Sequence, residues 1–299
     1  MFDASLDLEI RNAAFAHMNL LSAYHGSVIP RTELERGFEF KGATIHLVGP
    51  QGIFKPKLMD LPLTITTSPN SPYDDGLFED ALAYKYRGED PNHHENAGLR
   101  EVMKRELPLI YFKGARPGRY SAMWPVFVVS DDPGSLTFGM QVDEKSQLRF
   151  HIAQTDPLPE QVNRRRYATY QAKRRIHQDQ FREDVLDAYK EACSLCDLRR
   201  IPLLDAAHII EDSDGGEPVV SNGLSLCKIH HTAFDRNILG IRPDYVAEIR
   251  RDVLEEEDGP MLKHGLQEMN NRKIYVPHRF DKRPDPDALE MRYEQFRAA

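Results

Sequence analysis

The placement of the cysteines is the feature that most constrains the fold of this chain. The sequence has three cysteines in 299 residues, and all of them lie between Cys193 and Cys227. Cys193 and Cys196 form a Cys-x2-Cys pair, and Cys227 and His230 form a Cys-x2-His pair further along. Two short-range pairs separated by a longer segment are typical of a tetrahedral zinc site, because each pair can sit on a tight knuckle and the metal joins the knuckles. The spacing therefore predicts a structural Zn²⁺; the alternative is three reduced, buried cysteines.

The segment around these ligands has the pattern of a small ββα unit. LLDAAHII is apolar and β-prone, which predicts a short strand that carries His208. EDSDGGEP is rich in turn residues, and VVSNGLSLC is a second extended piece with Asn222 beside a glycine. IHHTAFDRN begins a helix, and residues four apart share one face of a helix. His231 and Asp235 can therefore point at the same ion.

This unit resembles the HNH, or ββα-metal, endonucleases. AHI, SNGL, LC-x2-HH and FDR stand in the expected order, over about residues 180–245. The resemblance implies that His208 is the general base that activates water against a phosphodiester. It also implies that His231 ligates one divalent cation, such as Mg²⁺ or Mn²⁺, and that Asn222 fixes the loop and orients the base.

The second protein ligand of this catalytic ion is a separate question. In many members of the family an acidic residue or a histidine directly precedes the base, whereas this chain has Ala207. Asp235 is the first candidate for that ligand and Asp205 is the second.

The N-terminal half has a different pattern. Residues 5–25 space apolar side chains at three and four positions, which predicts an amphipathic helix. From residue 49 to residue 133, apolar runs such as LTITT, LPLIYFKG and PVFVVS alternate with turns rich in Pro, Gly, Asn and Asp. ENAGLREVMKREL is a short helix between two of these strands. The pattern predicts a curved, mostly antiparallel sheet or barrel with helices packed on it.

A second resemblance lies in this half of the chain. GIFKP, PLTITT, PYDD, YKYRG and NAGLREVMKRELPLIYF, over about residues 45–130, look like the SRA (YDG) domain of the PUA superfamily. The resemblance implies a reader that flips a modified cytosine out of the duplex into an aromatic cage. Tyr73 and Tyr86 are then the cage candidates, and Asp74 or Asp75 is the reader of the exocyclic amine. Lys55 is a candidate for a phosphate contact.

The chain departs from that family at the predicted pocket. Ser71 and Pro72 stand where the family commonly has two glycines, and Arg87 stands where it commonly has threonine. A different modification, or a sister module such as EVE or YTH, is compatible with these departures. The other interpretation is that the two tyrosines are ordinary sheet aromatics and PYDDG is a turn.

A local basic cluster stands out because the chain as a whole has a net charge of −8. Its members are Arg164, Arg165, Arg166, Lys173, Arg174 and Arg175, with two tyrosines between them. A basic cluster in an acidic protein is the expected footprint of a phosphate backbone. The alternative is a solvated helix face.

Together these patterns predict an α+β protein of three parts. Residues 1–155 form a PUA/SRA-like reader of modified bases, residues 156–180 a basic linker helix, and residues 181–299 the ββα-metal HNH domain with its structural zinc. The first residues are acidic and mixed, and no apolar run approaches a membrane span, so a cytoplasmic protein without a membrane partner is expected.

The predicted function is that of a modification-dependent, type IV-like DNA endonuclease acting in phage defence. It would read 5-methylcytosine or 5-hydroxymethylcytosine in double-stranded DNA and cut nearby, as a homodimer, since a double-strand cut by a one-site enzyme needs two subunits. One alternative is an HNH nuclease whose N-terminal domain reads phosphorothioate DNA, RNA or a partner. Another is a non-catalytic DNA-binding protein.

Overall fold

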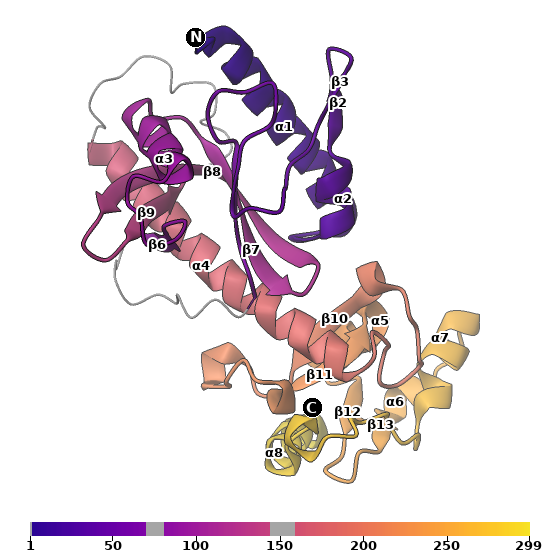
Figure 1. Ribbon diagram of the computed structural model, residues 1–299. Coiled ribbons are helices and arrows are strands. Elements are labelled where there is room, and N and C mark those ends of the chain that lie inside the picture. The colour runs from indigo at the N-terminus through magenta and orange to yellow at the C-terminus, as the bar shows by residue number, and fades with distance from the viewer. Residues whose placement is uncertain (1, 70–80, 144–158) are drawn as a thin grey trace. The chain divides into compact units, whose positions relative to one another are not determined.

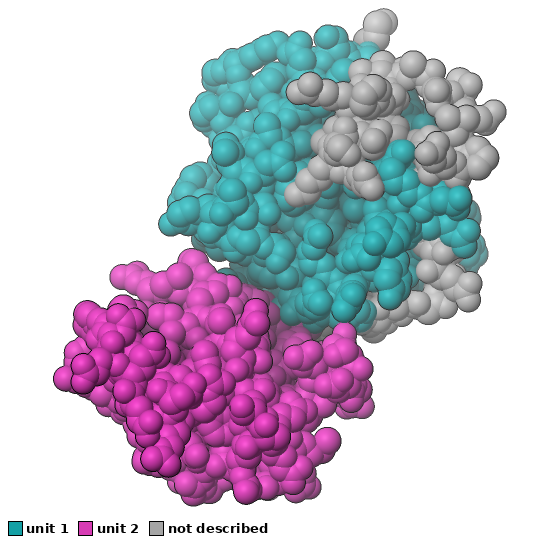
Figure 2. Space-filling model, turned by 180° about the vertical axis from the view of Figure 1, so that it is seen from behind, with its two compact units in different colours: residues 1–179 teal, residues 180–299 magenta. Residues whose placement is uncertain are grey.

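The structure is a computed structural model that describes residues 2–69, 81–143 and 159–299. Its contacts divide the chain into two compact units, residues 1–179 and residues 180–299 (Figure 2). The division falls inside one long helix, α4 (Pro159–Ala188), so most of the predicted linker belongs to the first unit. The function assigned to each unit stays a prediction. Among the described residues, no helix is both long and apolar enough to cross a membrane.

A curled sheet of seven strands forms the centre of the first unit (Figure 1). Its order is β4-β5-β7-β8-β9-β6, and β1 pairs with β8. β5 and β7 are parallel, and the other pairs are antiparallel. The strands are β1 (Val28–Pro30), β4 (Ile53–Phe54), β5 (Thr64–Thr67), β6 (Leu82–Lys85), β7 (Leu109–Arg116), β8 (Arg119–Asp132) and β9 (Thr137–Val142), and a separate hairpin joins β2 (Phe38–Phe40) to β3 (Ala43–Ile45). The predicted α+β class and curved sheet are confirmed, and the PUA/SRA assignment stays a prediction.

Helices cover both faces of this sheet. They are α1 (Ala4–His25), α2 (Arg31–Arg36), α3 (His94–Lys104) and the first part of α4. Ile110 and Phe112 of β7 join a core with the apolar side of α1, whereas Leu109 and Tyr111 join a core with α3. Successive side chains of a strand point to opposite faces, so one strand serves both cores. The predicted N-terminal amphipathic helix is confirmed by α1.

The second unit contains the predicted ββα arrangement. An antiparallel hairpin joins β10 (Leu204–His208) to β11 (Gly223–Cys227), and α5 (Lys228–Asp235) follows directly. The remaining elements are β12 (Leu239–Ile241), β13 (Ala247–Ile249), α6 (Arg251–Leu254), α7 (Pro260–Gly265), α8 (Pro286–Ala298) and the 3-10 turns η2 (Ile201–Leu203), η3 (Asp212–Asp214), η4 (Val220–Asn222), η5 (Gln267–Met269) and η6 (Phe280–Lys282). The second extended piece is shorter than predicted, because its first residues form η4.

The last turns of α4 pack on the hairpin of this unit. Phe181, Val185 and Tyr189 are buried in one core with residues of β10 and β11. A Cβ at Gly223 would lie 2.5 Å from Val185 and 2.9 Å from the Phe181 ring. Glycine is therefore required at this position for the helix to approach the strand.

Candidate active site and zinc cluster

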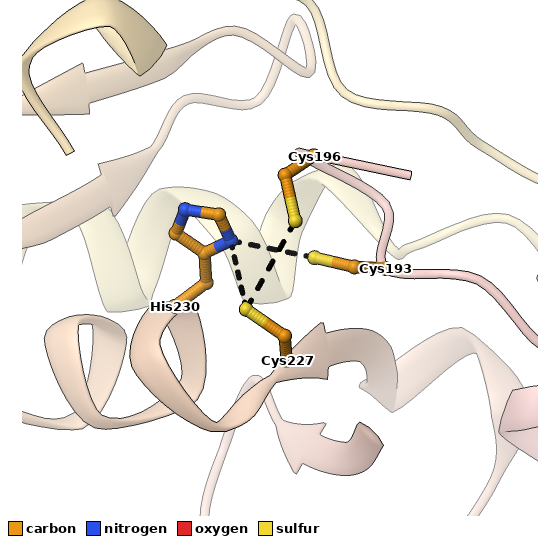
Figure 3. Close-up of side chains that lie close together, drawn as sticks. All are labelled: Cys193, Cys196, Cys227 and His230. Carbon is orange, nitrogen blue, oxygen red and sulfur yellow. Dashed lines mark hydrogen bonds between the residues drawn. The ribbon is translucent and has the colours of Figure 1, made fainter. Parts of the chain in front are cut away.

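The four predicted zinc ligands lie together (Figure 3). Cys193 and Cys196 come from the turn after α4, Cys227 ends β11, and His230 is in the first turn of α5. The Nδ1 atom of His230 is 3.4 Å from the sulfur of Cys193 and 3.3 Å from that of Cys227. The sulfurs of Cys196 and Cys227 are 4.0 Å apart, and all four ligand atoms lie within 4.8 Å of one another.

These distances fit a tetrahedral zinc ion. With Zn–S near 2.3 Å and Zn–N near 2.0–2.1 Å, tetrahedral ligands stand about 3.8 Å apart between sulfurs and about 3.6 Å apart between sulfur and nitrogen. The outer nitrogen of His230 also has a partner, because Nε2 lies 2.7 Å from the carbonyl oxygen of Gly265. A hydrogen bond from Nε2–H would leave Nδ1 as the metal-binding atom. The cluster could therefore hold zinc and join the turn after α4 to the hairpin and α5.

His208 stands at the end of β10, opposite Gly223 of the neighbouring strand. Its imidazole stacks on the ring of Phe181, with the centroids 4.1 Å apart and an angle of 16° between the planes. The side chain is half-buried, and this burial lowers its pKa below the ordinary value of 6.5. His208 is therefore mostly neutral at pH 7, as a proton acceptor must be.

Asn222 is buried and holds the loop that follows His208. Its Oδ1 accepts from the amide of Ile210 at 2.9 Å, and its Nδ2 donates to the carbonyls of Ile210 (2.9 Å) and Glu217 (3.0 Å). Gly216 lies against the same loop, since a Cβ there would be 2.0 Å from the Ile210 carbonyl oxygen. The loop is thus fixed at both ends by one amide side chain.

His231 lies between two carboxylates. Its Nδ1 is 3.1 Å from Oδ2 of Asp205 on β10, and its Nε2 is 3.4 Å from Oδ2 of Asp235, one turn along α5. Lys228 donates to the other oxygen of Asp205 at 2.6 Å. The hydrogen bond with His231 is the main cause that lowers the pKa of Asp205 to about 2, so this carboxylate is ionised at neutral pH. Both candidates for the second ligand therefore contact His231, at opposite nitrogens.

The acidic limb of the pH–rate profile is expected below pH 6.5. Burial lowers the pKa of His208, the nearby Asp212 and Glu211 oppose that shift, and His231 adds to it. Because the base acts in its neutral form, the midpoint of the fall in rate should lie below pH 6.5. Single-turnover cleavage at saturating Mg²⁺ measures this limb without loss of metal. A midpoint above 6.5 would contradict the role of the half-buried imidazole.

The predicted contacts to the DNA backbone fall into two groups. Arg164 and Arg165 donate to the fully buried carboxylate of Asp143, at 2.8 Å and 3.0 Å, and Arg165 is itself buried. These two arginines are used inside the fold. Lys173 is partly buried, and the exposed members of the cluster are Arg166, Arg174 and Arg175.

The predicted base pocket is described only in part. Tyr73, Asp74 and Asp75 lie outside the described residues. Tyr86 is only 7% exposed, its ring is 4.6 Å from that of Phe138, and it donates a hydrogen bond to Asp131. Arg100 lies over the Tyr86 ring at 5.2 Å and also bonds to Asp131. Tyr86 directly follows β6 and packs in the core on that face of the sheet, and its role in a base cage stays a prediction. Lys55 donates to the carbonyl of Met59 at 3.0 Å.

Two side chains near the site were missed from the sequence. Phe181 supports His208 from a distant helix, and Arg292 of α8 donates to the carbonyl of Phe234 at the end of α5 (2.5 Å). The Arg292 guanidinium also lies 4.7 Å from the centroid of the Phe234 ring. No local pattern could have revealed either contact, because each joins segments that are far apart in the sequence.

Comparison with known proteins defines the class of the second unit. Residues 193–242 match the family model described as HNH endonuclease. The protein thus contains an HNH endonuclease domain and is a metal-dependent nuclease.

Two solved structures are similar to the chain. One is the "Modification dependent TagI restriction endonuclease", with 18% identity, a TM-score of 0.30, and coverage of 79% of this chain and 81% of that one. The other is the "Type IV phosphorothioation-dependent restriction endonuclease ScoMcrA", with 14% identity, a TM-score of 0.20, and coverage of 58% and 45%. No curated protein matches the sequence.

Proposed function

We propose that the protein is a modification-dependent DNA endonuclease. Its first unit flips and reads a modified cytosine, and its second unit hydrolyses a nearby phosphodiester with one divalent ion. The observation that carries the nuclease half is the arrangement of His208, Asn222 and His231 on the ββα unit, with a carboxylate at each nitrogen of His231. The reading half rests on the SRA-like motifs and on the curled sheet.

Each residue of this site in the second unit would have a separate role in the hydrolysis. His208 takes a proton from the attacking water, and Phe181 keeps its imidazole in place by stacking. Asn222 holds the loop after His208, so that the base does not drift. A bound Mg²⁺ or Mn²⁺ supplies positive charge to the phosphate and to the leaving oxygen. The imidazole of His231 and one carboxylate would hold that ion.

Asp235 is the carboxylate that we assign to the ion. Asp205 is already paired with Lys228 and lies at Nδ1 of His231, where it can accept a hydrogen bond and fix the ring. Nε2 is then the ligand atom, and it faces Oδ2 of Asp235 at 3.4 Å. Two ligand atoms about 2.1 Å from one ion stand roughly 3.0–3.4 Å apart. Asp205 is therefore a positioning residue.

A Mg²⁺ titration of the cleavage rate distinguishes these two carboxylates. Asp235→Ala is expected to prevent saturation in the millimolar range, because it removes a ligand. Asp205→Asn is expected to raise the half-saturating Mg²⁺ concentration by about 10- to 100-fold, while the rate still saturates. Loss of a residue that orients a metal ligand typically weakens metal binding by this factor. The opposite pattern, with saturation lost only in Asp205→Asn, would reverse the assignment.

Cleavage of matched duplexes tests the proposed function. The duplexes would contain cytosine, 5-methylcytosine or 5-hydroxymethylcytosine at the same positions, in Mg²⁺, Mn²⁺ or EDTA. The expected result is cutting of modified DNA alone, and only with metal. Equal cutting of all three duplexes would retain the nuclease and reject the reader. The same assay on DNA with one or two modified sites tests the homodimer, because a dimer would favour two.

The exposed arginines of α4 supply a candidate contact to the duplex. Arg166, Arg174 and Arg175 are exposed, unlike the buried Arg165. Positive side chains of this kind bind phosphate without regard to sequence, so they would hold the duplex on the first unit.

A further inference from the structure

A cavity in the first unit has the composition of a small-molecule site. Its volume is about 410 Å³, and it lies between β4 and the first turn of α3. Its wall includes Gln51, Phe54, Lys55, Asp60, His94 and Glu95. A volume of a few hundred cubic ångströms with an aromatic wall and a few polar groups is typical of ligand pockets.

The carboxylate of Glu95 is the unusual group in this wall. Its side chain is only 12% exposed, and its Oε2 is buried with no hydrogen-bond partner among the described residues. Its ion-pair partner is Arg87, whose Nε lies 3.9 Å from Oε2, too far for a hydrogen bond. Buried carboxylates normally accept hydrogen bonds, so one that lacks them at a cavity indicates a missing donor.

Beside the two carboxylates of the cavity, Glu95 and Asp60, stand groups that can donate. Lys55 gives one proton to the carbonyl of Met59 and has two further protons, and the amide of Gln51 can also donate. A ligand that fits presents an amine to Glu95 and acceptor atoms beside it. The Watson–Crick edge of cytosine has this order, with the N4 amine next to N3 and O2. Thymine would place an oxygen against the carboxylate.

We propose that this cavity receives the flipped cytosine, with Glu95 accepting from its exocyclic amine and Phe54 against its ring. The inference rests on the proposed function and differs from the cage predicted around Tyr73 and Tyr86. Lys55, predicted to contact phosphate, lies in the wall of the cavity and faces the base.

Binding of full-length protein to labelled duplexes tests this assignment, with Ca²⁺ in place of Mg²⁺ to prevent cleavage. One position of the duplex carries cytosine, 5-methylcytosine, thymine, adenine or guanine. Glu95→Gln replaces an acceptor by a group that also donates, so it should weaken binding of the 5-methylcytosine duplex by roughly 5- to 100-fold. It should also strengthen binding of the thymine duplex relative to the wild type, a gain that a merely structural role would not produce.

A second variant blocks the cavity, and a control variant changes a carboxylate outside it. Gln51 is exposed, so Gln51→Trp should fill the cavity without disturbing the core and should abolish the preference for the modified duplex. Glu101→Gln changes an exposed carboxylate on the same helix, where it pairs with Lys104, and should bind as the wild type does.

The failures of the two proposals are distinguishable. If the wild type prefers modified DNA and both pocket variants keep that preference, the cavity assignment is wrong and the reader stands. If the wild type binds all duplexes equally, the reader is rejected and this inference fails with it. A loss in Glu95→Gln that is confined to the adenine or guanine duplex would overturn the assignment to cytosine.

Discussion

Replacing His208 by alanine is expected to lower the single-turnover rate of cleavage by about 10²- to 10⁴-fold, which is the usual contribution of a general base. The physical reason is that the imidazole, whose pKa is lowered by burial, is the neutral acceptor placed at the end of β10. Loss of the ring removes the acceptor and leaves the ligands of both ions in place. DNA binding and zinc content should therefore be unchanged, and only the rate should fall.

His264→Ala is the matched control for this experiment. His264 is an exposed histidine of the same unit, where it pairs with Glu268 in an i, i+4 arrangement. Its replacement should leave the rate within a factor of two or so, since exposed pairs contribute little. If His208→Ala cuts as fast as the control, the ββα unit would be a zinc-stabilised scaffold of a DNA-binding protein.

Removal of the zinc cluster is expected to unfold the second unit. Cys227→Ser removes a ligand that ends β11 and directly precedes α5, so the hairpin, the helix and the turn after α4 lose their common anchor. Structural zinc supplies about 10–16 kcal/mol of apparent binding free energy in zinc-finger peptides, more than most domains have as total stability. Elemental analysis should show one zinc per wild-type chain and none in the variant.

Hydrogen exchange gives an internal control for that prediction. The amides of β10, β11 and α5 should lose protection in Cys227→Ser, whereas those of α1 and β7 should keep it because their cores contain none of the four ligands. His264→Ala should keep both zinc and protection. A Cys227→Ser protein with full zinc and unchanged exchange would show that the cluster does not hold the unit together.

Local sequence patterns predicted the elements that carry the nuclease site. The zinc ligands come as two pairs, each with two intervening residues. The spacing within each pair is visible in the sequence and does not depend on the rest of the fold. The positions of His208, Asn222 and His231 on a strand, at a turn and on a helix followed from apolar runs, turn residues and helical spacing. The boundaries were less accurate, as the 3-10 turn at Asn222 shows.

Long-range pairing accounts for what the sequence did not show. Arg164 and Arg165 belong to an obvious basic cluster, but both bind the buried Asp143, which precedes them by about twenty positions. The sequence ranked Asp235 ahead of Asp205 as the second ligand, but only the structure shows that the two carboxylates contact different nitrogens of His231. Such contacts depend on packing between elements, and the local periodicity of the sequence does not predict which elements pack together.

The sequence by itself determined the class of this protein, since the zinc spacing and the ordered His, Asn and His residues are local patterns of a nuclease unit. Only the tertiary structure decided which of the predicted side chains are buried and what each of them contacts. In the fold, Tyr86 and Arg165 are buried and Phe181 stacks on His208. Glu95 lies beside a cavity. The physical reason is that burial and hydrogen bonding are properties of surfaces brought together from distant segments, which residue type and spacing do not encode.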